Sequence, residues 1–151
     1  MPITDHDRFD ALRERLSRQM LISGFGEEGQ KKIIAARFLV IGAGGLGSPA
    51  LLYLASAGAC HITIVDPDEV SENNLSRQIL HESASIGCNK AQNAARELLR
   101  WNPQIEVRAV MKRMNSAEDL TPLVKEADIV LDCSDTVSYT HLRAHETLRH
   151  L

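Results

Sequence analysis

The sequence of 151 residues lacks the features that mark several classes of protein. Only 4% of its residues are aromatic, and its three cysteines, Cys60, Cys88 and Cys133, form no C-x-x-C pair, which argues against a zinc knuckle, a redox dithiol and a disulfide scaffold. No apolar run approaches the roughly 20 residues of a membrane span, and the acidic beginning lacks the basic and apolar regions of a signal peptide. We therefore expect a cytoplasmic protein with reduced thiols and no membrane association.

An excess of basic residues is missing as well. A total of 17 Lys and Arg against 20 Asp and Glu gives a formal net charge of −3. The field of the whole molecule therefore does not attract polyanions, and we expect no nucleic acid partner. Any phosphate site must be built locally. The remaining composition, 44% hydrophobic and 25% charged, is typical of one ordinary globular domain.

Two helices are predicted before the main fold. Apolar residues spaced three or four apart between Asp10 and Ile22 predict one amphipathic helix, and Glu27–Ala36 predicts a second, shorter one. The continuous apolar run Phe38–Ile41 that follows is typical of a strand buried on both faces of a parallel sheet.

Predicted strands and helices then alternate along the chain. Further strands are expected over His61–Asp66, Ile105–Ala109 and Ala127–Leu131, and helices over Leu46–Gly58, Asn89–Trp101 and from Ser116 onward. This alternation predicts an α/β fold with a Rossmann-like, doubly wound, mostly parallel sheet and two preceding N-terminal helices.

The alternation ends at Asp135. Residues 136–151 hold three of the six histidines but no strand, glycine turn or core face, and Ser138–Thr147 resembles translated adaptor sequence. We therefore interpret the fold as C-terminally truncated and residues 136–151 as an aberrant tail. The alternative is a metal site in this segment, because His141 and His145 lie four residues apart and would share a helix face.

A glycine-rich segment joins the first predicted strand to the helix after it. Gly42-Ala43-Gly44-Gly45-Leu46-Gly47 matches G-x-G-x-x-G, a pattern in which backbone amides at a helix N-terminus bind phosphate. Asp66 follows at about the distance at which this motif places an acid that binds ribose. A nucleotide is expected, although the motif alone leaves NAD, FAD and ATP open, and the glycines could also serve only a tight turn.

Two cations lie where they could meet a nucleotide's phosphates. Arg77 is in the polar segment at the mouth of the predicted crevice, and Lys90 opens the next predicted helix. A pair of cations would suit a triphosphate, because charge builds on the leaving oxygens when a phosphoryl bond breaks. Each could instead be a solvated surface charge.

Taken together, these sequence motifs resemble those of the ThiF/MoeB/HesA-type, E1-like adenylyltransferases. The matching segments, in family-like order and spacing, are Arg15–Gln19, Gly42–Gly47, Asp66–Asp68, Asn74–Gln78, Lys90 and Leu131–Asp135. Leu16 departs from the family's usual Tyr, and Thr136 stands where the family usually has Asn. Residues 1–135 are accordingly similar to the N-terminal part of an E1-like ATP-binding domain.

The resemblance implies an activity, cofactors and partners. The activity is ATP-dependent adenylylation of the C-terminal glycine of a small ubiquitin-like sulfur carrier protein, in molybdopterin or thiamine biosynthesis. The implied cofactors are ATP and Mg²⁺, whereas the cysteine pairs that hold Zn²⁺ in complete family members are absent from this sequence. The implied assembly is a homodimer in which Arg18 completes the partner's active site.

The resemblance also implies residue roles. Gly42, Gly44, Gly45 and Gly47 would approach the phosphates, Asp66 would hold the ribose, Asn74, Arg77 and Lys90 would bind the polyphosphate, and Asp135 would hold Mg²⁺. Arg18, Arg77, Lys90 and Asp135 would be the catalytic set.

Two alternatives stay open. A Rossmann oxidoreductase that binds NAD or FAD would need only the glycine motif and Asp66, although it would leave the Arg15–Gln19 and Asn74–Gln78 strings unexplained. A catalytically inactive, truncated relative is the other alternative. The fourth predicted strand would then have uncovered apolar faces, which predicts marginal stability or aggregation.

Overall fold

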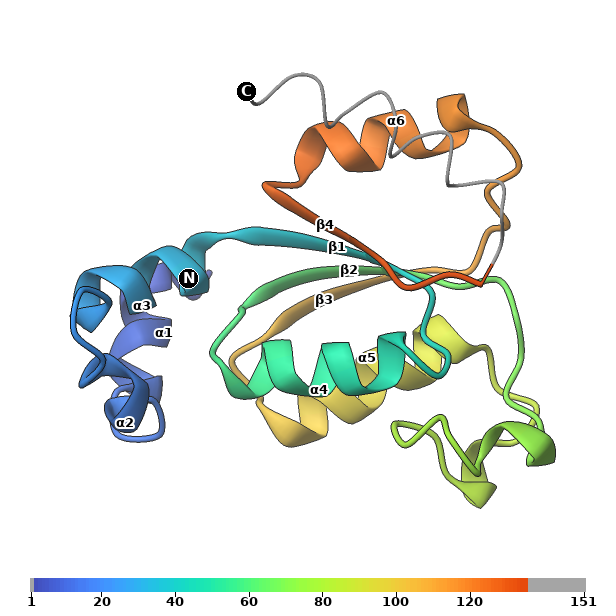
Figure 1. Cartoon of the computed structure of the whole chain (residues 1–151), viewed down its shortest axis with the longest axis horizontal. Helices are drawn as coiled ribbons and strands as arrows, with labels where there is room; N and C mark the ends of the chain where they lie inside the picture. Colours follow the sequence, from blue (N-terminus) through green and yellow to red (C-terminus); the bar gives the residue numbers. More distant parts are fainter. Residues whose placement is uncertain (1, 136–151) are drawn as a thin grey trace.

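The computed structural model describes residues 2–135, which form a parallel sheet flanked by helices (Figure 1). The sheet has four strands in the order β3-β2-β1-β4. They are β1 (Arg37–Ile41), β2 (His61–Val65), β3 (Glu106–Val110) and β4 (Ile129–Asp132). All three strand pairs are parallel. Because β2 and β4 lie on opposite sides of β1, the strand order reverses there, and open α/β sheets bind ligands at such a switch point. The predicted fold class is confirmed.

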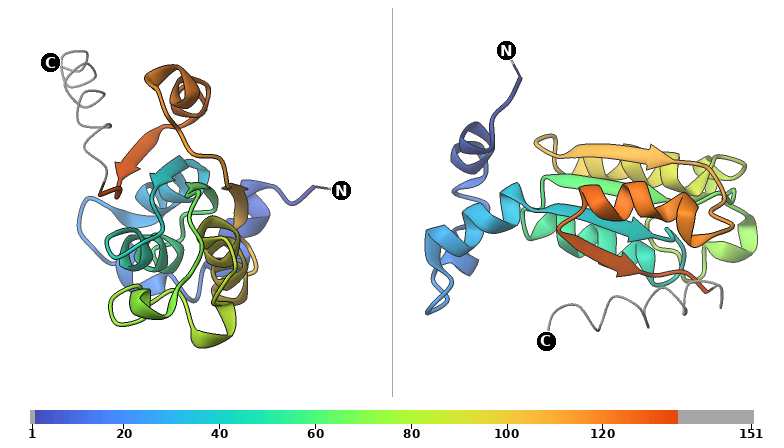
Figure 2. Two further views of the ribbon diagram at one scale, coloured as in Figure 1. Left: turned by 90° about the vertical axis from the view of Figure 1, so that its right-hand side faces the viewer. Right: turned by 90° about the horizontal axis from the view of Figure 1, so that it is seen from above.

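The helices lie on both faces of the sheet and beyond one end of it. They are α1 (Asp5–Leu12), α2 (Ser17–Met20), α3 (Gly26–Ala35), α4 (Gly47–Ser56), α5 (Lys90–Trp101) and α6 (Ala117–Glu126), with short 3₁₀ turns at Glu72–Asn74 and Ser83–Ser85. Figure 2 shows α4 and α5 on one face, α6 on the other, and α1 to α3 beyond the amino ends of the strands. Within residues 2–135, none of these helices has the length and apolar character to cross a membrane.

Strand β1 is buried on both faces, as its apolar run predicts. Phe38 and Val40 join the core formed with α4 and α5, whereas Leu39 and Ile41 join the core formed with α6. Successive side chains of a strand point to opposite faces, so a strand between two helical layers must be apolar throughout. This packing fixes β1 at the centre of the molecule and places its carboxyl end at the switch point.

The single helix predicted over Asp10–Ile22 is wrong. Helix α1 begins earlier because Thr4 and Asp7 form a capping box, in which the Asp7 carboxylate accepts the Thr4 amide at 2.9 Å. The chain then turns before α2, so that Leu12 and Leu16 both pack in a small core with α3. The apolar spacing therefore reflects packing against α3 and not one continuous helix. The second predicted helix is confirmed as α3.

Strand β4 forms an edge of the described sheet. It pairs only with β1, and Ile129 and Val130 remain 42% and 38% exposed. An edge strand with exposed apolar side chains offers a template for association. The expectation of uncovered apolar residues on the fourth strand is therefore met.

Candidate nucleotide-binding site

A cavity of about 630 Å³ opens at the carboxyl ends of the strands. The loops that follow all four strands contribute to its wall. Of the residues predicted for the site, those that line it are Gly42, Gly44, Gly45, Asp66, Arg77, Lys90 and Asp135. Residues separated by up to about ninety positions in the sequence thus meet at one place, as expected at a switch point.

Two glycines of the turn between β1 and α4 are required by the packing of the chain itself. Gly42 has a φ of +94°, and a Cβ there would lie 2.8 Å from the Cys133 carbonyl oxygen. A Cβ on Gly47 would overlap the Gly42 carbonyl oxygen. Both positions therefore need glycine whether or not a ligand binds.

The other two glycines are not required by the chain's own packing. A Cβ on Gly44 would lie 3.5 Å from Gln78 Nε2, and one on Gly45 would lie 3.8 Å from Arg77 Cγ, which are ordinary contacts. Both residues line the cavity. Glycine at these positions would allow a ligand to approach the backbone closely.

Backbone amides of the same turn have no acceptor within the described residues. No hydrogen bond to another described residue engages the N–H groups of Gly44, Gly45 and Leu46, the last residues before α4. Such amides at a helix N-terminus, together with the positive end of the helix dipole, form an anion site. The turn can therefore receive a phosphate without losing any internal bond.

The buried carboxylate of Asp66 connects β2 to the glycine turn. One of its oxygens accepts the Ala43 amide at 2.8 Å and the other accepts the Asp68 amide at 2.9 Å, and the residue is 6% exposed. A carboxylate has about four acceptor positions, so Asp66 can still accept a ribose hydroxyl from the cavity. The position of Asp66 is thus compatible with the predicted binding of ribose. Its bond to the Ala43 amide also holds the glycine turn in place.

Lys90 and Arg77 approach the cavity from different elements. Lys90 begins α5, is 8% exposed, and its ammonium lies 4.0 Å from an Asp68 carboxylate oxygen. The Arg77 guanidinium donates to the Asn73 carbonyl oxygen at 2.9 Å, and no carboxylate of residues 2–135 pairs with it. Arg77 therefore keeps most of its donors available to an anion.

Asn74, which the resemblance predicts to bind the polyphosphate, lies beside the cavity and bonds within its own loop. Its side-chain oxygen accepts the Ser71 amide at 3.2 Å and its amide donates to Asn73 at 2.9 Å, so it closes the 3₁₀ turn in which it lies. It does not line the cavity. Because the Arg77 amide donates to the Asn74 carbonyl oxygen at 3.1 Å, Asn74 shapes the loop that presents Arg77.

Sequence reasoning missed the loop after β3. Arg113, Met114 and Asn115 line the cavity, and the Arg113 guanidinium is 2.8 Å from Asp68. The available signal was positional: these residues follow a predicted strand, just as Asp66 follows another, and the carboxyl ends of parallel strands share one edge. Gln78 also lines the cavity, although the sequence predicted no separate role for it beyond the Asn74–Gln78 motif.

Arg18 lies away from this cavity. It is an exposed residue of α2, beyond the amino ends of the strands (Figure 1). The neighbouring Gln19 donates to the Ala57 carbonyl oxygen at 2.8 Å, as does the buried Gln30 at 3.0 Å, which fixes α2 and α3 to the end of α4 opposite the glycine turn. A helix of this length separates its two ends by about 15 Å.

Two acidic residues lie at the carboxyl end of β4, Asp132 as its last residue and Asp135 three positions beyond. Asp135 lines the cavity, whereas one oxygen of Asp132 accepts both the amide and the hydroxyl of Ser134. Residues 2–135 contain no cluster of three or more metal-ligating side chains. Mg²⁺ is usually bound by one or two carboxylates with substrate phosphates and water, so Asp135 fits a metal that arrives with a nucleotide. His141 and His145 lie outside the described residues.

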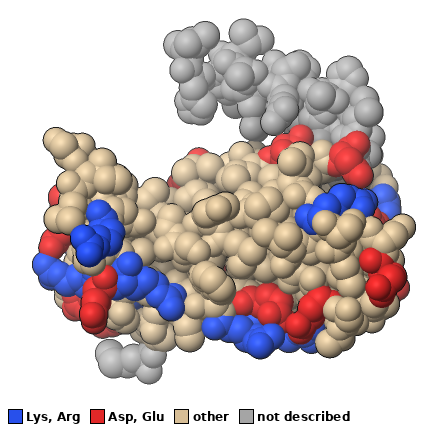
Figure 3. Space-filling model, turned by 60° about the horizontal axis from the view of Figure 1, so that its bottom comes forward, with Lys and Arg blue, Asp and Glu red and all other residues tan. Residues whose placement is uncertain are grey.

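The cavity is local and not part of a general basic surface. On the face shown in Figure 3, Lys and Arg side chains lie beside Asp and Glu side chains and form no single basic patch. This distribution agrees with the net charge of −3. A phosphate group would therefore be attracted by the turn and its two cations and not by the molecule as a whole.

A parallel sheet with these glycines in its first turn, an acid after β2 and a cavity at the switch point defines a Rossmann-like nucleotide-binding domain. Comparison with known families is more specific, because the model of the ThiF family matches residues 16–147. The chain belongs to the ThiF family, and the resemblance identified from its motifs is confirmed.

Curated relatives are named adenylyltransferases. The chain is 45% identical over 128 residues to the probable adenylyltransferase/sulfurtransferase MoeZ of Mycobacterium tuberculosis, a match that covers 85% of this chain and 32% of that protein. It is 44% identical over 124 residues to the molybdopterin-synthase adenylyltransferase of Escherichia coli, covering 82% and 49%. The chain spans about a third to a half of the length of these relatives.

Solved structures with the same fold include nucleotide complexes. The E. coli tRNA N6-threonylcarbamoyladenosine dehydratase TcdA in complex with ATP has a TM-score of 0.80 and 26% identity, covering 96% of this chain and 59% of that one. E. coli MccB with ATP has a TM-score of 0.76 and 30% identity, covering 87% and 44%. The fold around the cavity is thus shared with proteins crystallised with ATP.

Proposed function

We propose that the chain supplies the ATP-binding part of an adenylyltransferase that activates the C-terminal glycine of a small ubiquitin-like sulfur carrier protein. The observation that supports it most directly is the glycine turn, in which the amides of Gly44, Gly45 and Leu46 have no acceptor in the described residues and which adjoins Arg77 and Lys90. The names of the curated relatives and the ATP complexes of similar structures support ATP over NAD or FAD.

In this proposal, each part of the cavity has a separate task. The turn amides and Arg77 hold the phosphates, Lys90 offsets their charge, and the Asp66 carboxylate accepts a ribose hydroxyl. Asp135 binds a Mg²⁺ ion that neutralises the triphosphate. Asp68, which lies between Lys90 and Arg113, releases Lys90 when a phosphate provides a stronger partner.

The proposed reaction needs no protein nucleophile. A carboxylate oxygen of the carrier's terminal glycine attacks the α-phosphorus of ATP, the bond to the β-phosphate oxygen breaks, and pyrophosphate leaves with the electron pair. The product is an acyl adenylate. Because the attacking carboxylate is already ionised, the protein contributes position and charge neutralisation, which are the terms that Arg77 and Lys90 can supply.

We further propose that the protein works as a homodimer. Arg18 lies at the far end of α4 from its own glycine turn, so a role at an active site requires the turn of a second copy. The exposed apolar side chains Leu21 and Ile22 close to α2 support an interface at this end of the molecule. Analytical ultracentrifugation tests it: a monomeric complete protein with full activity would exclude it.

The pathway and the extent of the domain belong to the same proposal. A role in molybdopterin biosynthesis is supported by the name of the E. coli relative, whereas thiamine biosynthesis and a cytoplasmic location are proposed from the motif resemblance alone. Residues 1–135 are proposed to be the N-terminal part of the ATP-binding domain. Residues 136–151, which lie outside the described part, are proposed to be foreign to the fold. Independent sequencing of the source DNA past the Asp135 codon tests this last point.

A binding comparison tests the proposed function. Isothermal titration calorimetry of the 151-residue chain should detect Mg·ATP and no NAD, and a complete protein should exchange pyrophosphate into ATP when its carrier is present. Binding of NAD without ATP would replace the proposal with a dinucleotide oxidoreductase. ATP binding without exchange would identify an inactive relative.

A further inference from the structure

His81 lies beneath the glycine turn and contacts it directly. The residue is 6% exposed, and its Nε2 is 2.8 Å from the carbonyl oxygen of Ala43, the second residue of the glycine motif. Its Nδ1 is 2.8 Å from Asn93 Nδ2, on α5. None of the sequence motifs assigns a role to His81. His81 and Ala43 are 38 positions apart in the chain.

The neighbours of His81 determine where its proton lies. The side-chain oxygen of Asn93 accepts from Arg96, so the amide nitrogen of Asn93 faces His81. An amide nitrogen only donates. Nδ1 of His81 is therefore the acceptor, and Nε2 carries the hydrogen that it donates to Ala43.

The hydrogen bond to Ala43 also orients the next amide. The C=O of Ala43 and the N–H of Gly44 belong to one trans peptide group and point in opposite directions. A carbonyl directed at a buried histidine therefore directs the Gly44 N–H away from the interior, toward the cavity that Gly44 lines. On its other side, the Ala43 amide is held by Asp66 at 2.8 Å.

We propose that His81 is a positioning residue that holds the Ala43–Gly44 peptide group so that the Gly44 amide faces the nucleotide phosphates before they bind. The inference rests on the proposed function, because it assigns His81 to the phosphate end of the same ATP site. Donors held in place in advance need no reorganisation when the anion arrives.

The environment of the ring favours its neutral form, which suits this task. Burial lowers the pKa of His81, and the hydrogen bond to the Ala43 carbonyl oxygen only partly opposes that effect. A neutral ring with its single hydrogen on Nε2 gives the turn one fixed donor.

A pair of polar substitutions tests the geometry. In His81→Gln the side-chain amide reaches the place of Nε2 and can still donate to Ala43, whereas in His81→Asn it reaches only the place of Nδ1. We expect Mg·ATP affinity of the 151-residue chain to fall on the order of tenfold in His81→Asn and to stay within about threefold of wild type in His81→Gln. Adenosine, which has no phosphate, should bind all three proteins equally.

The matched control is Asn102→Ala, at the other end of α5. Asn102 is fully buried and its side chain accepts the Gln104 amide at 3.1 Å, far from the cavity. This variant should lose thermal stability while keeping wild-type affinity for Mg·ATP. Loss of ATP and adenosine binding in equal proportion in His81→Asn would show a purely structural role and overturn the inference, as would wild-type ATP affinity in that variant.

The folded wild-type chain offers a second measurement. Nitrogen-15 NMR should show His81 protonated at Nε2, and the Gly44 amide should be among the resonances that shift most on addition of Mg·ATP. Protonation at Nδ1 alone would overturn the inference while leaving the proposed function standing. Failure of the wild type to bind Mg·ATP would instead overturn the proposed function.

Discussion

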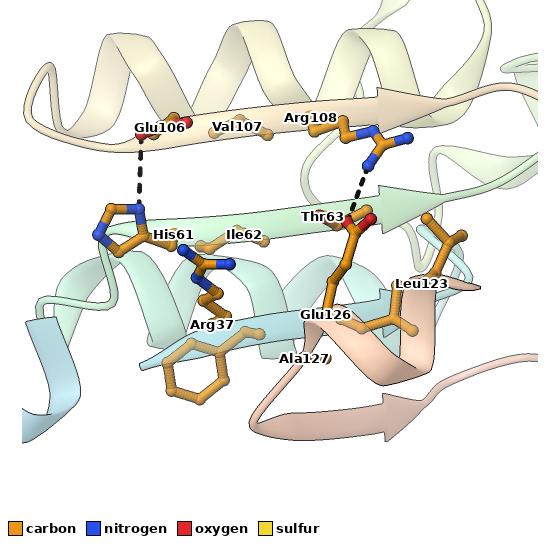
Figure 4. Close-up of a pocket in the computed structure, with 12 residues that line it drawn as sticks. Arg37, His61, Ile62, Thr63, Glu106, Val107, Arg108, Leu123, Glu126 and Ala127 are labelled. Atoms are coloured by element: carbon orange, nitrogen blue, oxygen red, sulfur yellow. Dashed lines mark hydrogen bonds and ion pairs between the residues drawn. The ribbon is translucent and has the colours of Figure 1, made fainter. Parts of the chain in front are cut away.

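Two cavities of the same sheet differ in how many of their polar groups are already paired. The smaller, of about 330 Å³, lies over the amino halves of β1, β2 and β3 beside α6 (Figure 4). Four of the side chains in its wall form two pairs, Arg108 with Glu126 at 3.1 Å and His61 with Glu106 at 3.5 Å, whereas the Arg37 side chain has no ion pair among the described residues. At the carboxyl ends, by contrast, the amides of Gly44, Gly45 and Leu46 have no acceptor in the described residues, and Arg77 has no carboxylate partner there.

This difference identifies the binding end better than size does. A charge that has a partner in the fold must give it up to bind a ligand, which offsets the gain. A turn amide with no partner in the described residues gains a bond and loses only water.

An added methyl group should disrupt the fold at one kind of glycine in the turn and only weaken ligand binding at the other kind. Gly47→Ala should abolish the native fold, because its Cβ would overlap the Gly42 carbonyl oxygen. Gly45→Ala should keep the fold, because the nearest atom to its Cβ beyond the adjacent residues would be Arg77 Cγ, at 3.8 Å, and should weaken Mg·ATP binding. Circular dichroism and calorimetry measure the two effects. A folded Gly47→Ala protein would show that the turn is less tightly packed than described.

Removing a cation at the carboxyl end should affect the nucleotide far more than removing one at the amino end. Arg77→Ala and Lys90→Ala should each weaken Mg·ATP binding by about 10- to 100-fold and, in a complete protein, sharply reduce pyrophosphate exchange with the fold intact. Arg108→Ala is the matched control, because Arg108 lines the other cavity, and should change neither. Wild-type exchange in both cavity variants would refute the assignment.

The exposed edge at β4 should make the chain associate. Since Ile129 and Val130 are exposed on an edge strand, sedimentation velocity should detect species larger than a dimer as concentration rises. Ile129→Lys combined with Val130→Lys should reduce them, because charge on an edge opposes strand pairing. Leu99→Lys on α5, a site with 42% exposure, should have no such effect. A monodisperse wild type that melts cooperatively would contradict the prediction.

The buried histidine should make stability depend on pH. Because burial lowers the pKa of His81 in the folded state, the unfolded chain, with its ordinary histidine pKa of about 6.5, binds more protons as the solution is acidified. The free energy of unfolding should therefore fall as pH drops below about 6.5. His81→Gln should show a shallower fall in urea denaturation. Identical slopes for the two proteins would exclude His81 as the source.

An exposed ion pair at the amino end should matter least. Arg108→Ala should lower the free energy of unfolding by less than about 1 kcal/mol, because Arg108 and Glu126 are 59% and 60% exposed. Urea denaturation in low and high salt measures it, with Glu126→Ala as the matching half of the pair. A loss of several kcal/mol would mean that this cavity is less solvated than its exposure indicates.

Much of the fold could be predicted because its signals are local. The strand at Phe38–Ile41 appears as a continuous apolar run, and the glycine turn follows it directly. Helix α5 has a recognisable start at Asn89, which caps it by accepting the Gln92 amide. The Asp66 position follows from the same βαβ unit. Each of these features depends on residues that are close together in the sequence, no further apart than one strand, the turn after it and the next helix.

The N-terminal region shows where local signals mislead. Apolar residues at helical spacing run through two helices and the turn between them, because Leu16 packs in the same small core as Leu12 although it lies beyond the end of α1. Periodicity reports which side chains are buried, and a turn that keeps them buried leaves the pattern unchanged. Only the packing against α3 distinguishes the two arrangements.

The sequence by itself determined the α/β class, the glycine turn and the acid after β2, because each depends on short-range spacing and backbone chemistry. Tertiary structure alone decided that Arg113 joins the wall, that Asn74 closes a turn beside the cavity, and that His81 lies under Ala43. Those contacts join segments whose spacing along the chain carries no periodic signal. They form because parallel strands bring their carboxyl ends, and the loops that follow them, to one edge of the sheet.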